Sequence, residues 1–99
     1  MFTGPKYVTR GIKENVPTFL QNILWYMIET LEVEAKDYLQ VFHLDGITEE
    51  GRLKQKVVHT QEEPDYRKEF TLCTKQIVSG KIYVIDDTTH CTMLLAEEY

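Results

Sequence analysis

Apolar side chains recur every three to four residues in the segment 16–31, a spacing that predicts one amphipathic helix. They share one side of that helix, whereas Asn22 and Glu29 fall on the opposite side. A helix of this length is marginally stable alone, so it needs a surface against which to bury its apolar side. The apolar positions are Val16, Leu20, Ile23, Leu24, Met27, Ile28 and Leu31.

The rest of the chain has the alternating apolar and polar pattern, and the turn-forming residues, that are typical of strands and hairpins. Residues 38–44 carry apolar side chains on both faces, which predicts a central strand. Asp45 and Gly46 predict a turn, followed by a solvated loop over 47–51. The predicted strands span residues 6–12, 38–44, 52–61, 66–73, 81–85 and 90–96, with hairpins joining the third to the fourth and the fifth to the sixth.

These elements predict an α+β fold in which one amphipathic helix packs on a mainly antiparallel sheet of about six strands, in the order β-α-β-β-β-β-β. The 99 residues are enough for one core and too few for two, so we expect a single domain over 1–99. A hydrophobic share of 42% with 27% charged residues is typical of a folded globular chain rather than a disordered one.

The net charge of −5 opposes binding to phosphate backbones and to anionic membranes. We therefore do not expect nucleic acid as a partner, although one basic group keeps that alternative open. The group lies on two segments that we expect to be adjacent strands, which predicts a local basic patch. It consists of Lys54, Lys56, Arg67 and Lys68.

The two cysteines, Cys73 and Cys91, are few for a disulfide-stabilised scaffold. The N-terminus does not read as a signal peptide, and no apolar run approaches the roughly 18 residues of a membrane span. We therefore expect a cytoplasmic protein with reduced thiols and no membrane association.

The segment from Asp86 to Cys91 concentrates carboxylate, imidazole and thiol groups, all of which bind divalent metals. Asp and Thr are also the ordinary residues of tight turns, so a plain hairpin turn is the favoured interpretation and no cofactor is predicted. A metal-dependent or small-ligand enzyme using Asp86, Asp87 and His90 remains the alternative. Of the other histidines, nothing in the sequence brings His43 or His59 toward that turn.

Four residues are candidates for contact with a protein partner. Trp25 falls well away from the apolar side of the helix, with Tyr26 on the other shoulder, so Trp25 is either shielded by another segment or exposed. Exposed tryptophan and tyrosine on a helix are typical interface anchors. Glu62 and Glu63 lie in an acidic loop that is either simply solvated or able to imitate DNA phosphates in a basic groove.

Five blocks of the chain, in matching order, resemble a small family from Gram-positive bacteria known as domain of unknown function 960. The blocks are YVTRG (7–11), DYLQVF (37–42), HTQEEP (59–64), VIDD (84–87) and MLLAEEY (93–99). The resemblance implies a cytoplasmic bacterial protein with a role near mobile DNA or phage. It implies no catalytic residue, because the blocks are strand and turn sequences.

Our leading hypothesis is a small cytosolic, non-enzymatic protein-interaction module, an inhibitor or adaptor that presents Trp25, Tyr26, Glu62 or Glu63 to a protein partner. The metal-dependent or small-ligand enzyme at residues 86–90 is the second hypothesis. Nucleic-acid binding through the basic group is the third, and the net charge makes it the least favoured.

Overall fold

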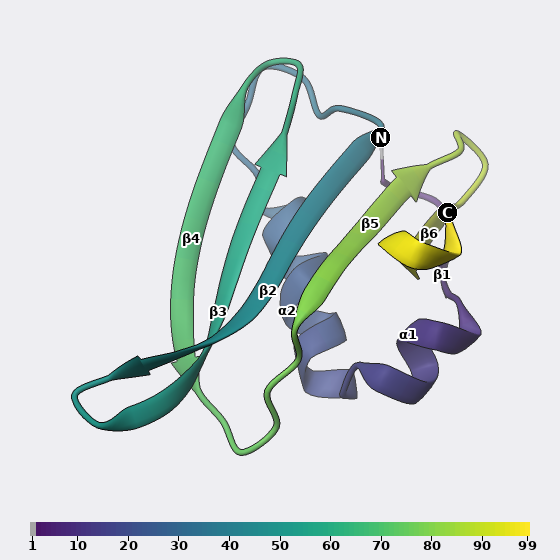
Figure 1. Ribbon diagram of the computed structural model, residues 1–99. Helices are drawn as coiled ribbons and strands as arrows, with labels where there is room; N and C mark the ends of the chain where they lie inside the picture. Colours follow the sequence, from purple (N-terminus) through teal and green to yellow (C-terminus); the bar gives the residue numbers. More distant parts are fainter. Residues whose placement is uncertain (1) are drawn as a thin grey trace.

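The computed structural model describes residues 2–99 and contains six strands, two α-helices and a short 3-10 helix (Figure 1). The mixed, mostly antiparallel sheet confirms the α+β fold class. In chain order the elements are β1 (Lys6–Val8), α1 (Arg10–Asn15), α2 (Thr18–Glu29), β2 (Leu39–Glu49), β3 (Arg52–Gln61), β4 (Tyr66–Cys73), β5 (Gly80–Asp86), β6 (Cys91–Leu95) and η1 (Ala96–Glu98).

All six strands form one sheet in the order β1-β6-β5-β2-β3-β4. Every neighbouring pair is antiparallel except β1 and β6, which run parallel. The predicted hairpins β3–β4 and β5–β6 are confirmed, and β2 has the predicted central position between β5 and β3.

The core lies between α2 and one face of the sheet. α2 passes behind β2 and β5 in the view of Figure 1 and buries Leu20, Leu24 and Ile28 completely. Each such side chain contributes about 1.5–3 kcal/mol on burial, which explains how a helix of 12 residues is held in place. The sheet residues in this core are Phe42, Leu44, Val57, Ile82, Val84, Cys91 and Met93.

The predicted helix over 16–31 is confirmed, with shorter bounds. Val16 is extended and ends α1, and Pro17 is the N-cap of α2, with φ −58° and ψ 146°. Pro17 lacks a side chain that could cap the helix, but its carbonyl accepts hydrogen bonds from the amides of Leu20 and Gln21, both at 3.0 Å. At the other end, the Thr30 hydroxyl donates to the Tyr26 carbonyl at 2.8 Å.

The predicted first strand, 6–12, is wrong beyond Val8. The chain turns into α1 because Thr9 is its N-cap, and the Thr9 hydroxyl accepts a bond from the Ile12 amide. Ile12 is fully buried in the core and fixes this short helix against the sheet.

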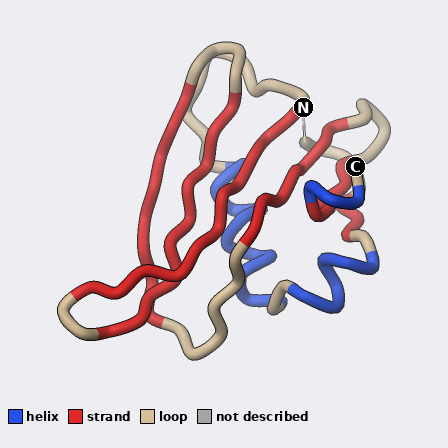
Figure 2. Tube along the Cα trace, in the orientation of Figure 1, coloured by secondary structure: helices blue, strands red, loops and turns tan. Residues whose placement is uncertain are grey.

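The predicted turn at Asp45 and Gly46 and the loop over 47–51 are also wrong, because β2 continues to Glu49. The turn lies instead at Glu50 and Gly51, whose φ values of 52° and 76° are those of a two-residue hairpin turn. Gly46 pairs with a residue of β3 inside the ladder; an added Cβ there would lie 2.9 Å from Ile77 Cγ2. Figure 2 shows the hairpin projecting beyond the rest of the sheet.

The last residues hold the first helix in place. The Glu98 carboxylate accepts hydrogen bonds from the Thr9 hydroxyl at 2.6 Å, the Leu95 amide at 2.8 Å and the Gly11 amide at 3.1 Å. The bonds from Thr9 and Gly11 tie η1 to the start of α1, and the bond from Leu95 fixes the carboxylate within its own segment. We call the three bonds together the Glu98 clasp. Within residues 2–99, neither α-helix has the length and apolar character to cross a bilayer.

Candidate functional site

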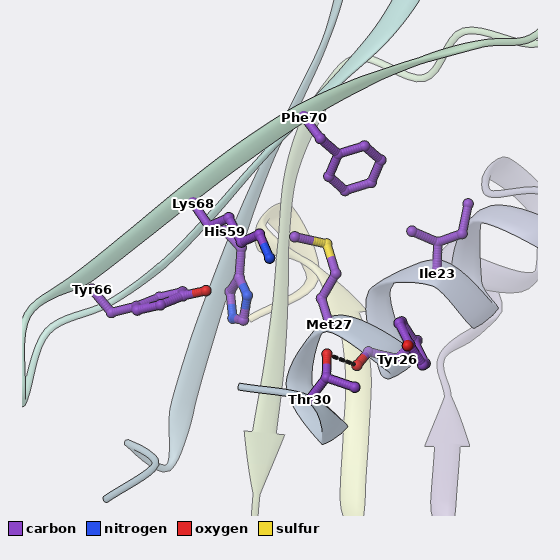
Figure 3. A pocket seen from close by; sticks show the side chains of 8 residues that line it. All are labelled: Ile23, Tyr26, Met27, Thr30, His59, Tyr66, Lys68 and Phe70. Carbon is purple, nitrogen blue, oxygen red and sulfur yellow. Dashed lines mark hydrogen bonds between the residues drawn. The ribbon is translucent and has the colours of Figure 1, made fainter. Parts of the chain in front are cut away.

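A cleft opens on the flank of the molecule where α2 stops covering the sheet (Figure 3). Its volume is about 340 Å³, within the range of roughly 300–1,000 Å³ that is usual for ligand sites. We call it the α2–β4 cleft. It is lined by Ile23, Tyr26, Met27 and Thr30 from the helix and by His59, Tyr66, Lys68 and Phe70 from β3 and β4.

The register of β3 and β4 determines which strand residues reach the cleft. His59 pairs with Lys68, and Gln61 pairs with Tyr66, so these side chains share the face that carries α2. The neighbouring residues point to the opposite face, where Val58 is half-buried. The cleft is thus formed by one face of a hairpin and one flank of a helix.

His59 is the lining residue of the cleft with no exposed surface of its own. Its ring stacks on Phe42 at a centroid distance of 4.4 Å and meets Tyr66 edge to face at 5.5 Å. Desolvation, with a smaller contribution from the Lys68 charge, lowers the pKa of His59 to about 4. The imidazole is therefore neutral at neutral pH.

A series of buried amides determines which imidazole nitrogen carries the proton. The Gln61 amide nitrogen donates to the carbonyls of Ala35 and Pro64, so Gln61 Oε1 is left to accept from the Gln40 amide nitrogen at 2.8 Å. Gln40 Oε1 then faces His59 Nε2 at 2.6 Å and can only accept. His59 Nε2 therefore bears the hydrogen, and Nδ1 is a hydrogen-bond acceptor.

His59 Nδ1 has no hydrogen-bond partner in the described part of the chain, residues 2–99, and it exposes less than 1 Å². Leaving a buried acceptor unpaired costs about 1–3 kcal/mol, so such atoms are rare in folded proteins. His59 Nδ1 is such an unpaired acceptor, and it lies beside the α2–β4 cleft.

The two predicted aromatic contacts lie on opposite flanks of α2. Tyr26 is 64% exposed at the rim of the α2–β4 cleft. Trp25 is half-buried against the core, with Lys6 Nζ 5.8 Å from its ring centroid. Lys6 Nζ also lies 3.5 Å from the Glu29 carboxylate, and this ion pair holds Lys6 beside the Trp25 ring. The N-terminal segment therefore shields Trp25 in part.

The predicted acidic contacts, Glu62 and Glu63, are exposed in the turn between β3 and β4. Hydrogen bonds to Asp37, in the connection between α2 and β2, hold this turn in place. The Glu63 amide donates to the Asp37 carboxylate at 3.1 Å, and the Gln61 side-chain oxygen accepts from the Asp37 amide. Tyr66, at the start of β4, joins this turn to the cleft.

The turn at Asp86 to His90 has the geometry of a plain hairpin. The Asp87 amide donates to the His90 carbonyl at 2.8 Å, and His90 Nε2 lies 3.7 Å from the Asp87 carboxylate. Nowhere in residues 2–99 do three or more His, Cys, Asp or Glu side chains gather in a way that could hold a metal ion. Cys73 is exposed, Cys91 is buried, and both are free thiols.

The remaining candidate groups are dispersed over the molecule. His43 pairs with Val58 and lies on the face opposite His59. Lys54, Lys56 and Arg67 share that opposite face, whereas Lys68 lines the cleft. Lys54, Lys56 and Arg67 are each paired with a carboxylate. Glu49 lies 3.1 Å from Lys54, and Glu69 lies 3.9 Å from Lys56 and 2.7 Å from Arg67. The structure thus does not assemble the four basic residues into one patch.

Comparison with known proteins agrees with this fold. Residues 5–98 match the family described as staphylococcal protein of unknown function (DUF960). A crystal structure of a protein of unknown function from Enterococcus faecalis is similar over 97% of this chain and 91% of that chain, with a TM-score of 0.75 and 23% identity. At this identity the likeness shows the fold alone. No protein with curated annotation matches the chain.

Proposed function

The chain belongs to the family of staphylococcal proteins of unknown function, DUF960, and we propose that it is a small binding protein that docks a protein partner on the flank where α2 meets β4. One observation carries the proposal: Tyr26 stands 64% exposed at the rim of an apolar cleft of about 340 Å³. A tyrosine beside a cavity is typical of interface centres, where it buries a large area at low entropic cost.

Other features of the flank favour binding over catalysis. A general base is most effective when its pKa lies near the working pH, whereas burial lowers the pKa of His59 to about 4. The surroundings of the cleft also provide both signs of charge, with Lys68 on its lining and Glu62 and Glu63 in the adjoining turn. Such charges set the orientation and the rate of association more than the affinity.

The proposed partner is a protein, and the family resemblance implies a class for it: an enzyme of host defence or DNA processing that an inhibitor or adaptor from mobile DNA would control. Within this proposal Tyr26 is the central contact. Glu62 and Glu63 are peripheral, and Trp25 contributes mainly to the stability of α2 because it is half-buried.

The proposal is tested by affinity purification from the native cell with quantitative mass spectrometry, using wild type, Tyr26→Ala and Tyr7→Ala. Tyr7 is 55% exposed on β1, at the other edge of the sheet, and is the matched control. We expect one protein to be enriched by wild type and by Tyr7→Ala, and its recovery to fall about tenfold with Tyr26→Ala, as is usual for an interface anchor. Equal recovery by all three proteins would exclude this flank as the docking surface.

A further inference from the structure

We infer that the α2–β4 cleft receives a tryptophan or tyrosine side chain of the partner, whose N–H or O–H group donates a hydrogen bond to His59 Nδ1, with a neighbouring acidic residue of the partner paired to Lys68. The inference rests on the proposed function and adds the chemistry of the residue that is bound. Three features of the cleft carry it: a fixed acceptor, apolar walls and an unpaired ammonium group.

The acceptor is fixed by the surrounding structure. Gln40 cannot rotate its amide without losing its bonds to the Asp37 carbonyl at 2.9 Å and to Gln61 at 2.8 Å. Its Oε1 therefore always faces His59 Nε2, and His59 Nδ1 always presents a lone pair. An occupant that bonds to this atom has to bring a donor, so a phenylalanine or leucine leaves the acceptor unpaired.

The walls of the cleft suit a flat aromatic ring. Ile23 and Met27 from the helix face Phe70 from β4 across the cavity (Figure 3). In the same figure the Met27 side chain extends from the helix toward the strand residues, with its end beside Lys68, and His59 Nδ1 is closed from solvent. Methionine has three rotatable bonds and a polarisable sulfur, and the inference requires Met27 to turn aside so that an entering ring reaches Nδ1. Among protein side chains, tryptophan and tyrosine combine an aromatic body with a polar donor.

Lys68 determines which charge stands beside that ring. It is exposed on the cleft lining, and no carboxylate of residues 2–99 lies within 4.0 Å of its ammonium group. Its neighbour Arg67, by contrast, is paired with Glu69 at 2.7 Å on the other face. An acidic residue next to the bound aromatic side chain therefore finds a free cation at the edge of the cleft.

The test uses blocked dipeptides as probes of the partner residue, followed by NMR of protein carrying labelled methionine methyl groups. The probes are, in order, acetyl-aspartyl-tryptophan amide, the same peptide with 1-methyltryptophan, acetyl-lysyl-tryptophan amide and, as a small-molecule comparison, free indole. We expect the first to shift the Met27 methyl signal with a millimolar Kd. The second should bind about fivefold more weakly because it lacks the N–H donor. The third should also bind more weakly, because its charge is repelled by Lys68.

Three variants assign these preferences to residues. His59→Phe should bind the methylated and unmethylated peptides equally, and Lys68→Met should bind the aspartyl and lysyl peptides equally. His43→Phe changes a histidine on the opposite face and should behave as wild type. If His59→Phe does not fold, the comparison of the two tryptophan peptides on wild type decides the role of the donor.

Two results would overturn the inference: equal affinity of wild type for the methylated and unmethylated peptides, or tighter binding of free indole than of the aspartyl-tryptophan peptide, which would assign the cleft to a small molecule. Neither result affects the proposed docking flank, which stands or falls with the Tyr26→Ala purification.

Discussion

At the scale of single residues, the polar side chains of the core need the most explanation. Gln40, Gln61 and His59 are buried on the face of the sheet that carries α2, where apolar residues would pack without any hydrogen bonds. Each amide has its orientation imposed by the next, starting from backbone carbonyls in the loops. The series ends on an imidazole nitrogen that nothing in the described chain satisfies, so the energetic cost is concentrated on one atom beside the cleft.

The buried imidazole makes stability depend on pH. The pKa of His59 falls from 6.5 to about 4 on folding, so the unfolded chain binds the proton more tightly. Stability is therefore full above pH 6.5 and is lost progressively as the pH falls toward 4, by about 3 kcal/mol for this group. Urea unfolding at about pH 7, 5.5 and 4 measures this loss in the free energy of unfolding.

His59→Phe is the control for this pH effect, because it keeps the ring packing of Phe42 and Tyr66 and removes the titrating group. At neutral pH its stability should lie within about 1 kcal/mol of wild type, since the unpaired Gln40 Oε1 that it creates is offset by removal of the unpaired His59 Nδ1. Its stability should also fall less steeply with acid than that of wild type. Parallel pH profiles for the two proteins would contradict the assignment.

At the scale of elements, α1 depends on a contact from the far end of the chain. It has six residues, too few to be stable alone, and its first turn is bound by the Glu98 clasp. Hydrogen bonds from Thr9, the Leu95 amide and the Gly11 amide lower the pKa of Glu98. The carboxylate thus binds this site better than the protonated acid does.

Glu98→Gln should lower the melting temperature and speed hydrogen exchange at the amides of Gly11 and Leu95, because an amide side chain cannot accept all three bonds. The pKa of Glu98 is lowered from 4.5, so the difference from wild type should be complete above pH 4.5 and shrink in stronger acid. Differential scanning fluorimetry and exchange mass spectrometry measure the two effects.

Glu97→Gln is the matched control, because the adjacent Glu97 side chain is exposed and makes no hydrogen bond within the described chain. It should leave both the melting temperature and the exchange rates unchanged. A melting temperature for Glu98→Gln equal to that of wild type would show that the clasp does not stabilise α1.

Elements with long, regular patterns could be predicted from the sequence, and the others could not. The stripe from Leu20 to Ile28 has a helical period over more than two turns, and burial alternates along β3 from Lys54 to Gln61, so local pattern and tertiary environment agree. α1 was missed because Tyr7, Val8 and Ile12 favour strands, and what stabilises the helix lies at Glu98. Gly46 was read as a turn residue because nothing local shows that Ile77 packs against it.

The candidate site could be predicted only in part. Tyr26 stood out as an aromatic residue beside the apolar stripe, and it does lie at the cleft rim. Lys68 was grouped with Lys54 and Lys56 by charge, but the alternation of β4 puts it on the other face. His59 could not be recognised as special, because its tautomer depends on Gln40, which lies 19 positions earlier in the sequence, and on the bond between Gln40 and Gln61.

At the scale of the whole molecule, the sheet has one helix-covered face and one open face. The shortest dimension is 20 Å, which corresponds to two packed layers. On the open face Val41, Val58 and Tyr83 are half-buried and His43 is exposed. Stability should therefore depend unequally on the two faces.

Adjacent valines of β3 test this inequality with one chemical change. Val57 is fully buried beneath α2, whereas Val58 is half-buried on the open face. Val57→Ala should lower the free energy of unfolding by about 2 kcal/mol, through lost burial and a cavity, and Val58→Ala by less than about 1 kcal/mol. Urea denaturation at neutral pH measures both losses in the free energy of unfolding. A larger loss for Val58→Ala than for Val57→Ala would contradict the assignment of the core to the face covered by α2.

The parallel pairing of β1 with β6 has a consequence during protein synthesis. The ribosome makes β1 well before β6, and Thr9 meets Glu98 across 89 positions of sequence. The β2–β3–β4 ladder can form before β6 has been made, but β1 has no neighbouring strand in the sheet until β6 follows. The edge of the sheet that joins β1 to β6 is therefore completed after the β2–β3–β4 ladder.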